Sequence, residues 1–498
     1  MAWSASFISA LDSATCGVEL RVETIGTALM VIAPDVYSER PDLGGTWAGL
    51  PVIVSASFDG EDLQLPEGQT SHGGFTLTLL GEALDAVAAA VRPGTILELK
   101  AAVAEIGKVG ALFERVALGV VESVGPTPGG DVEISAQGLG AFLGGRLETG
   151  TTNPALFAQA GVVQTQLDAS YTAGDTTVTV VSTTGWADLD SYGLYYFRVG
   201  SNILRATGRT ATTFTGVTGG RLGTTDAAGS VGADVELIAC LYGHPIKEAY
   251  KLLTSTGLGT YGLYDVLPGD WGLAVPAGMV NTGLGDVTRT ALGIGSWEVE
   301  MWSDTPVDNP LTWLEGYLNP LGFIVTLTQG EICVKALPNV ATWPIRAIIV
   351  EEDWVADEPP TQEIYDSRGS VEYGAWRAIS IETGATLSVL SEAVKTVPAE
   401  RYYDVELEGV YENGPPTAQD LESRIAAWYT RRSGLITGTL AGLRFAGLGP
   451  GDVVRVTHSG FRQADGSPFS TVRCVVLSAV ASLDDAVVAV TLAVPGLA

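Results

Sequence analysis

Residues 309–336 read NPLTWLEGYLNPLGFIVTLTQGEICVKA, and this stretch predicts a helix followed by a β-hairpin. Asn309 can cap a helix through its side-chain oxygen. Pro310 suits the first helical turn, because its missing N–H would have no partner there. Leucines then recur at helical spacing and predict one buried stripe, formed by Leu311, Leu314 and Leu318.

The second half of the same stretch predicts two paired strands. Phe323–Leu327 and Glu331–Ala336 are rich in β-branched and apolar residues, and the turn Thr328-Gln329-Gly330 separates them. A helix and a hairpin in so short a stretch indicate α+β structure at the centre of the chain.

Outward from this unit, the sequence predicts three more short helices. One starts at His244-Pro245 and ends at Gly257, one spans Glu82–Val91, and one spans Ala418–Arg432 after the capping residue Thr417. The first of them carries its apolar residues on one side: Ile246, Ala249, Leu252 and Leu253.

Most of the remaining chain predicts short strands between turn signals. In the first 145 residues these strands are Val18–Val22, Val52–Phe58, Phe75–Leu80, Ile96–Leu99 and Val132–Ser135. In the last 60 residues they are Leu443–Phe445, Val453–Val456, Val472–Leu477 and Val487–Leu492. Residues 370–412 also have the pattern of strands.

Residues 166–238 differ in composition from their surroundings, because they are rich in Thr, Gly and Val and almost without Lys. Strands are predicted at Thr176–Val181, Ile203–Ala206 and Thr213–Val217. We interpret this segment as a small all-β module inserted into a larger domain.

These patterns together predict an α+β, strand-dominated multidomain protein with small β-barrel-like domains and a few short helices. We expect an N-terminal β-rich, tube-like domain at 1–150 and the inserted Thr/Gly-rich module at 166–238. A central α+β domain is expected at 243–405, and a C-terminal β-rich domain with one helix at 406–498.

The formal charge of the chain is −30, from 27 basic and 57 acidic residues. Such a surface repels phosphates and anionic lipids, since a protein that grips nucleic acid needs Lys and Arg to displace counterions. The charge therefore disfavours nucleic-acid binding, and it would suit a surface that DNA passes without sticking. Solubility alone would also explain it.

Four cysteines, Cys16, Cys240, Cys333 and Cys474, are far apart and form no CxxC pair. We expect them to be reduced and buried rather than bound to zinc. The first residues lack the basic start and apolar core of a signal peptide, and no run of about 18 apolar residues predicts a membrane span. We therefore expect synthesis in a cytoplasm and no membrane insertion.

Two motifs resemble ligand-binding sites, but the sequence around each of them does not fit such a site. Gly257–Gly262 matches G-x-G-x-x-G but closes a helix, whereas a dinucleotide fingerprint opens one. Asp188–Gly193 resembles the start of a calcium loop, but Val199 stands at the twelfth position, where a bidentate acid is needed. We expect neither a nucleotide nor a calcium site there.

Catalytic signals are equally weak. Glu351-Glu352-Asp353 and Asp357-Glu358 form the densest acidic cluster, which we interpret as a solvated charge run. The three histidines, His72, His244 and His458, form no recognisable motif, and His244 is expected to be a loop or packing residue. We predict no catalytic residue, no metal site and no cofactor, although paired carboxylates brought together from distant segments remain an open route to hydrolysis.

Several aromatic residues and one arginine remain as candidate binding or pairing residues. Trp302, Trp313 and Trp354 are expected to be core or interface residues rather than a sugar platform. Arg221 is expected to pair with an acid of its own module. A glycan-binding surface of that module would use its clustered rings, namely Trp186, Tyr192, Tyr195, Tyr196 and Phe197.

Four stretches resemble proteins of tailed phages. Thr215–Thr224, TGVTGGRLGT, is similar to a "TGVTRGxxGT" run in a small tail-protein module, with the Arg-Gly order replaced by Gly220-Arg221 and Gly229 in place of the usual His. His244-Pro245 with its helix, Asn309–Ala336, and Leu448–Val456 with its Pro-Gly-Asp-Val turn resemble the baseplate or tail-tip hub family.

The resemblance implies a structural virion protein and not an enzyme. Hubs form homotrimers that close the tail tube, adapt six-fold to three-fold symmetry and serve as an assembly platform and part of the DNA ejection channel. Implied partners are a distal tail or tail tube protein on one side and a fibre, spike or other tip protein on the other, with DNA only passing through. No site residues carry over from this resemblance.

Three alternatives stay open at this point. The chain could be a distal tail or fibre-anchoring baseplate protein. It could be a tail protein that binds a host glycan through the aromatic residues of its module. A cell-wall hydrolase is the third alternative, and it would lose its activity on removal of a single Glu or Asp.

Overall fold

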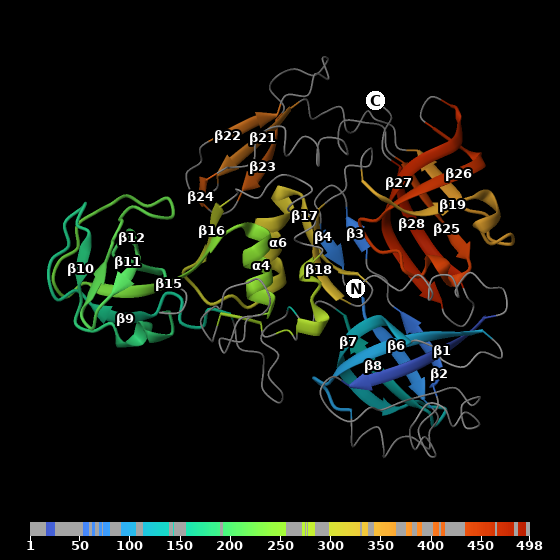
Figure 1. Ribbon diagram of the computed structural model, residues 1–498, viewed down its shortest axis with the longest axis horizontal. Coiled ribbons are helices and arrows are strands. Elements are labelled where there is room, and N and C mark those ends of the chain that lie inside the picture. Colours follow the sequence, from blue (N-terminus) through green and yellow to red (C-terminus); the bar gives the residue numbers. More distant parts are fainter. Residues whose placement is uncertain are drawn as a thin grey trace.

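The computed structural model describes residues 16–24, 53–58, 62–64, 69–71, 73–79, 91–105, 113–138, 143, 156–189, 193–254, 271–273, 275, 277–283, 298–328, 331–336, 343–364, 375–380, 386–390, 402–407, 410–413, 434–463, 466–482 and 487–494. Strands dominate these residues (Figure 1). The predicted helices at 82–91 and 418–432 lie outside them, except for Val91.

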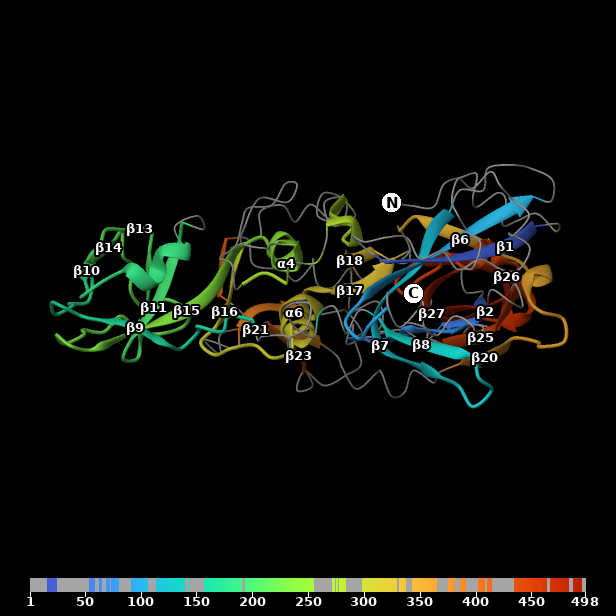
Figure 2. The same cartoon turned by 90° about the horizontal axis from the view of Figure 1, so that it is seen from below.

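The molecule is elongated, and its β-rich parts flank a small helical centre (Figures 1 and 2). The Thr/Gly-rich module lies at one end. The first and last β-rich parts lie together at the other end, and helices α4 (Pro245–Thr254) and α6 (Pro310–Leu318) lie between. A strand-dominated fold with few helices was predicted and is confirmed.

The first sheet is six-stranded and antiparallel, in the order β1-β6-β7-β8-β5-β2. Its strands are β1 (Cys16–Thr24), β2 (Ile53–Phe58), β5 (Phe75–Leu79), β6 (Ile96–Glu105), β7 (Phe113–Pro126) and β8 (Val132–Gln137). Alternate residues of β5 and β8 are buried, because successive side chains of a strand point to opposite faces. Five of the six strands overlap a predicted one; β7 was not predicted.

The module forms two small sheets around an aromatic core. Its elements are β9 (Val163–Gln166), β10 (Thr177–Thr179), the 3-10 helix η4 (Thr184–Leu189), β11 (Tyr195–Val199), β12 (Asn202–Ala206), β13 (Gly208–Arg209) and β14 (Thr213–Thr215). Phe197 and Phe214 stack with their ring centroids 4.6 Å apart, and Trp186 meets Phe214 edge-on at 5.2 Å.

One strand joins the module to the central part of the molecule. β15 (Asp234–Gly243) pairs with β11 through Val235–Ile238 and with β16 (Glu298–Ser303) through Ala239–Gly243. The sheet β12-β11-β15-β16-β24 thus runs from the module to β24 (Val410–Asn413). This continuous sheet crosses the limits expected for the module, so the division into four domains stays a prediction.

The central unit follows the predicted pattern closely. Asn309 caps α6, and its Oδ1 accepts a hydrogen bond from the Thr312 N–H at 3.1 Å. Leu314 and Leu318 are buried, whereas Leu311 is only half-buried. The hairpin of β17 (Phe323–Thr328) and β18 (Glu331–Ala336) follows a 3-10 turn that Gly322 ends at φ 75°.

The last sheet curls around its own core. It contains β19 (Ile345–Ile349), β20 (Thr361–Ile364), β25 (Gly434–Ala441), β26 (Val453–Arg462), β27 (Pro468–Ser482) and β28 (Val487–Val494), and the hairpin β3 (Asp62–Gln64)–β4 (Gln69–Ser71) adds to β27. The predicted strand at Leu443–Phe445 is wrong: these residues form a 3-10 turn, η10, which places Phe445 in the core.

A small three-stranded sheet completes the described part. It consists of β21 (Ala375–Ser380), β22 (Thr386–Leu390) and β23 (Tyr402–Leu407), with β21 and β23 parallel. Among the described residues, no helix is long and apolar enough to cross a membrane.

Candidate functional site

The glycine-rich loop of the module, Thr215–Thr224, contains several residues in the left-handed region, most of them glycines. Gly216, Gly220 and Gly223 have φ values of 62°, 68° and 75°, in the left-handed region that residues with a Cβ rarely adopt. Gly219 is needed for space instead, since a Cβ there would lie 2.1 Å from the Asp226 Oδ1. The sequence pattern therefore reflects the shape of the loop.

A polar pair, the half-buried Asp226 and the buried Asn202, holds this loop in place. Asp226 Oδ1 accepts hydrogen bonds from the Tyr171 hydroxyl at 2.8 Å and the Asn202 Nδ2 at 2.9 Å. Asn202, which is fully buried, also accepts the Gly220 N–H at 2.9 Å. The loop therefore presents its next residue, Arg221, in a fixed direction.

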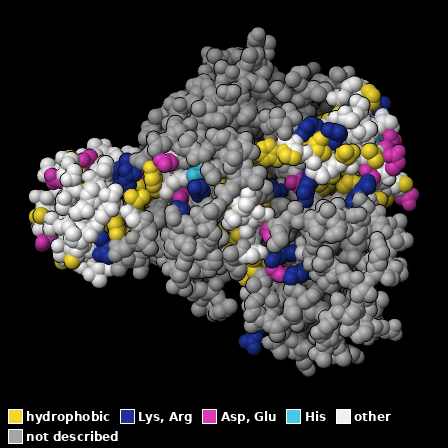
Figure 3. Space-filling model, viewed as in Figure 1, with side chains coloured by type: hydrophobic (Ala, Val, Ile, Leu, Met, Phe, Trp, Pro, Cys, Tyr) yellow, Lys and Arg dark blue, Asp and Glu magenta, His cyan; other side chains and the backbone are white. Residues whose placement is uncertain are grey.

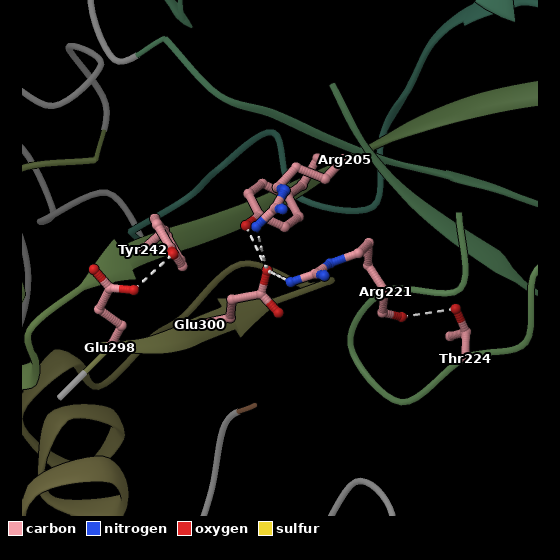
Figure 4. A network of polar contacts seen from close by, with 7 residues as sticks. Arg205, Arg221, Thr224, Tyr242, Glu298 and Glu300 are labelled. Carbon is pink, nitrogen blue, oxygen red and sulfur yellow. Dashed lines mark hydrogen bonds and ion pairs between the residues drawn. The ribbon is translucent and has the colours of Figure 1, made fainter. Parts of the chain in front are cut away.

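Arg221 reaches out of the module rather than into it. Its Nη2 binds the Oε1 of Glu300 on β16, outside the module in which an acidic partner was expected (Figure 4). The register explains the reach, because Tyr242 on β15 is paired with Glu300 and β15 belongs to both regions.

Glu300 gathers three donors from the module (Figure 4). The Tyr196 hydroxyl of β11 donates to its Oε1 at 2.6 Å, and the Arg205 Nη1 of β12 lies 3.4 Å away. Glu300 is 0% exposed. We call Tyr196, Arg205, Arg221 and Glu300 the module joint, since three residues of the module meet Glu300 of β16 there.

The Tyr196 hydroxyl and the Cys240 thiol near Glu300 are held in their neutral forms. Burial raises the pKa of Tyr196 well above the ordinary value of a tyrosine, and Cys240 and Glu300 raise it further. Burial likewise raises the pKa of the Cys240 thiol well above its usual value. A neutral phenol and a neutral thiol stabilise the structure but supply no nucleophile.

Two further polar contacts connect β-rich parts to the centre. In the N-terminal joint, the Arg115 Nη1 donates to the Gly278 carbonyl at 2.7 Å while its Nη2 binds Glu98. In the C-terminal joint, the Lys335 Nζ lies 3.2 Å from the Pro450 carbonyl and 3.4 Å from the Asp452 Oδ1.

The C-terminal joint brings together two stretches that the sequence singled out separately. Lys335 belongs to the hairpin of Asn309–Ala336, and Asp452 belongs to the Pro-Gly-Asp-Val turn. Asp452 Oδ2 accepts the Gly449 N–H at 3.0 Å, and Gly451 has φ 82°. The turn is thus shaped by its own residues and docks on the hairpin.

The rings proposed as a glycan platform are buried. Trp186 and Phe197 are 0% exposed, Tyr196 is 2% and Tyr195 is 4%, while Tyr192 lies outside the described residues. These four rings therefore form the core of the module and the module joint, which removes them as a sugar-binding surface.

The other tryptophans also pack against the protein. Trp313 meets Phe157 and Tyr317 edge-on at 5.3 and 4.9 Å, and Trp354 packs against His458 and Phe461. Trp302 is partly buried beside Ile238 and Cys240. His244 is buried and accepts the Ile246 N–H at 3.3 Å, as expected of a packing residue.

The acidic cluster is mostly exposed, as expected, with one exception. Asp353 is buried, binds Arg444 and accepts the Val350 N–H at 2.8 Å. Among the described residues, no three His, Cys, Asp or Glu side chains are placed to hold a metal ion. Gly257–Gly262, His72 and Cys16's side chain lie outside the described structure, as does most of Asp188–Gly193.

No protein-family model matches the chain, and no curated protein matches it. Solved structures resemble it at low identity. The tail protein from Neisseria meningitidis MC58 is 11% identical with a TM-score of 0.37, over 96% of each chain. The 43 kDa tail protein of prophage MuSo2 from Shewanella oneidensis is 10% identical with a TM-score of 0.34, over 97% of this chain and 100% of that one.

A prophage tail protein from Listeria monocytogenes EGD-e is 9% identical with a TM-score of 0.32, over 80% of this chain and 84% of its own. TM-scores below 0.5 do not establish a common fold. All three of these structures are tail proteins, and two of them come from prophages.

Proposed function

We propose that this chain is a structural protein of a phage tail, and that its copies form the hub ring at the end of the tail tube. The observation that carries the proposal is that each of the three polar joints described above connects a β-rich part to the central part of the molecule. Each joint consists of side chains that bind other parts of the same chain. Such an arrangement is what a rigid scaffold needs.

The motifs that resemble the hub family support the same role through their positions. The hairpin of Asn309–Ala336 and the turn at Leu448–Val456 contact each other through Lys335 and Asp452. The glycine-rich run Thr215–Thr224 presents Arg221 to Glu300. These stretches therefore fix the relative positions of three parts of the molecule, which is a mechanical rather than a catalytic task.

In the proposed ring the copies form a homotrimer that adapts six-fold to three-fold symmetry. One side contacts a distal tail or tail tube protein, and the other a fibre, spike or tip protein. Three chains at −30 each would bring −90 formal charges, and an acidic channel wall would let DNA pass without binding during ejection. A neutral or basic channel wall would contradict this last point.

The experiment is cryo-electron microscopy of particles that carry this chain, with the chain placed in the density at the tail end. We expect one three-fold ring below a six-fold tube. Six copies would indicate a distal tail ring instead, and density only on peripheral arms would indicate a fibre-anchoring protein.

A further inference from the structure

Three arginines lie together on the outer face of the last sheet. Ile348 of β19 is paired with Arg455 of β26, and Arg455 is paired with Arg473 of β27. Paired residues point to the same face. Arg346 lies at a register shift of β19 two positions before Ile348, and both residues are exposed while Ile349 is buried. We call Arg346, Ile348, Arg455 and Arg473 the arginine face.

The opposite face of these strands is the core, which confirms the direction of the arginines. Ile349, Val454, Val456 and Cys474 are each 0% exposed and pack in one cluster. On the arginine face, Arg346 is exposed and Ile348 is 56% exposed, whereas Arg455 and Arg473 are half-buried beside the buried pair Val453–Val475. Figure 3 shows Lys and Arg side chains among hydrophobic ones over this part of the molecule.

The arginine face has no carboxylate partner within the described part of the chain. Arg473 Nη2 donates to the backbone carbonyl of Trp343, and its Nε is buried without a hydrogen-bond partner. Like charges directly opposite each other on neighbouring strands destabilise a sheet. Arg455 and Arg473 are such a pair, so an acidic group from outside would offset their repulsion.

The same domain carries a complementary surface. Glu351, Glu352, Asp357 and Glu358 are exposed, and we call residues 351–358 the acidic segment. Glu351 accepts hydrogen bonds from Ser459, and Glu358 accepts one from Thr439, so neither is neutralised by these contacts. Figure 3 shows acidic side chains gathered at this end of the molecule.

We propose that the arginine face of one copy binds the acidic segment of a second copy of this chain. A contact between two different surfaces of identical chains is head-to-tail, and such contacts close into a ring when the rotation allows it. Arginine and apolar residues together are typical of interface cores, which fits Ile348 among the arginines. This inference rests on the proposed ring and names the surfaces that would form it.

The test compares self-association of the full chain by sedimentation velocity at low and high salt. The face variant is Arg346→Glu with Arg455→Glu, and the segment variant is Glu352→Lys with Asp357→Lys. Each is expected to weaken self-association by about ten-fold or more, which corresponds to about 1.4 kcal/mol. Arg92→Glu with Lys247→Glu, the control, makes the same charge change as the face variant elsewhere and should leave association as in the wild type.

A chain with all four reversals at the two surfaces regains complementary charges. We expect it to associate within about three-fold of the wild type, a recovery that a mere folding defect would not produce. Wild-type association by either double variant, no recovery in the four-fold variant, or a monomeric wild type would overturn the inference. Duplex DNA retained by the wild type but not by the face variant would overturn it in favour of nucleic acid. These outcomes leave the position of the chain in the tail, which microscopy tests, unaffected.

Discussion

At the module joint, one fully buried carboxylate faces two guanidinium groups and a phenol, whereas at the C-terminal joint one lysine reaches an aspartate that its own turn already holds. The two differ in how many contacts depend on one residue. Removing Glu300 takes away the carboxylate that Arg205 and Arg221 both bind. Removing Lys335 leaves Asp452 with the Gly449 N–H.

The module is therefore held by a cluster of contacts that all depend on Glu300. The last sheet is held by one weak polar contact together with apolar packing. Glu300 and Lys335 are both buried, so the number of charged contacts that depend on each residue sets the difference. The predictions below rank the two joints by that principle.

Glu300→Ala is expected to have the largest effect, a loss of about 3–5 kcal/mol, because the half-buried guanidinium groups of Arg205 and Arg221 lose the buried carboxylate that they share. Hydrogen exchange of β11, β12 and β16, followed alongside thermal unfolding, measures the loss. Glu298→Ala on the same strand is the control and should cost about 1 kcal/mol or less. Equal protection in the two variants would show that the module joint does not hold the module.

Gly219→Ala is expected to destabilise the module by about 1–3 kcal/mol, since the added Cβ would meet the Asp226 Oδ1 and displace the loop that presents Arg221. Calorimetry of the purified chain measures the shift. Gly125→Ala, where a Cβ has nothing within 4 Å, should leave the transition in place. A shift of similar size in the Gly125 variant would contradict the steric explanation.

Lys335→Met keeps the apolar stem of the side chain and removes its charge. We expect a loss of about 1–2 kcal/mol, because Asp452 and the Pro450 carbonyl lose one donor. Chemical denaturation followed by tryptophan fluorescence measures it. Lys247→Met, on the half-buried side of α4, should change stability by about 0.5 kcal/mol or less. A loss as large as that of Glu300→Ala would overturn the ranking of the two joints.

The smallest effect concerns pH. Burial, with the hydrogen bond and charge of Asp226, raises the pKa of Tyr171 from 10.0 to about 12. A folded pKa above the unfolded one means that the stabilisation is complete below pH 10 and is lost as the pH rises toward 12. The unfolding midpoint should therefore fall less steeply in this range for Tyr171→Phe than for the wild type. Parallel curves would contradict this role of Tyr171.

Local signals predicted the elements well, because caps, turns and apolar spacing act within a few residues. Asn309 caps α6, and the hairpin at Phe323–Ala336 has the expected strands. The joints could not be predicted in this way. Arg221 and Glu300 are 79 residues apart, and only the register of β15 with β16 brings them together. Trp186 and its neighbours were equally ambiguous, since the same rings suit a core or a sugar platform.

The strand predicted at Leu443–Phe445 was wrong for a local reason. Its apolar residues fit a strand, but the segment sits between β25 and the turn at Leu448–Val456, where the chain must change direction. A single 3-10 turn places Phe445 in the core and reverses the direction of the chain before the next strand. Tertiary demands override a short apolar run, as they often do for weak strand signals.

The chain enters the module through β9 and leaves it through β15, and these two strands are hydrogen-bonded neighbours, with Gln166 opposite Asp234. The two ends of the insertion are thus already side by side, so what lies between them can change in length or sequence without moving either end. The outer module can therefore be replaced, in evolution or by design, while the sheet that carries it keeps its register.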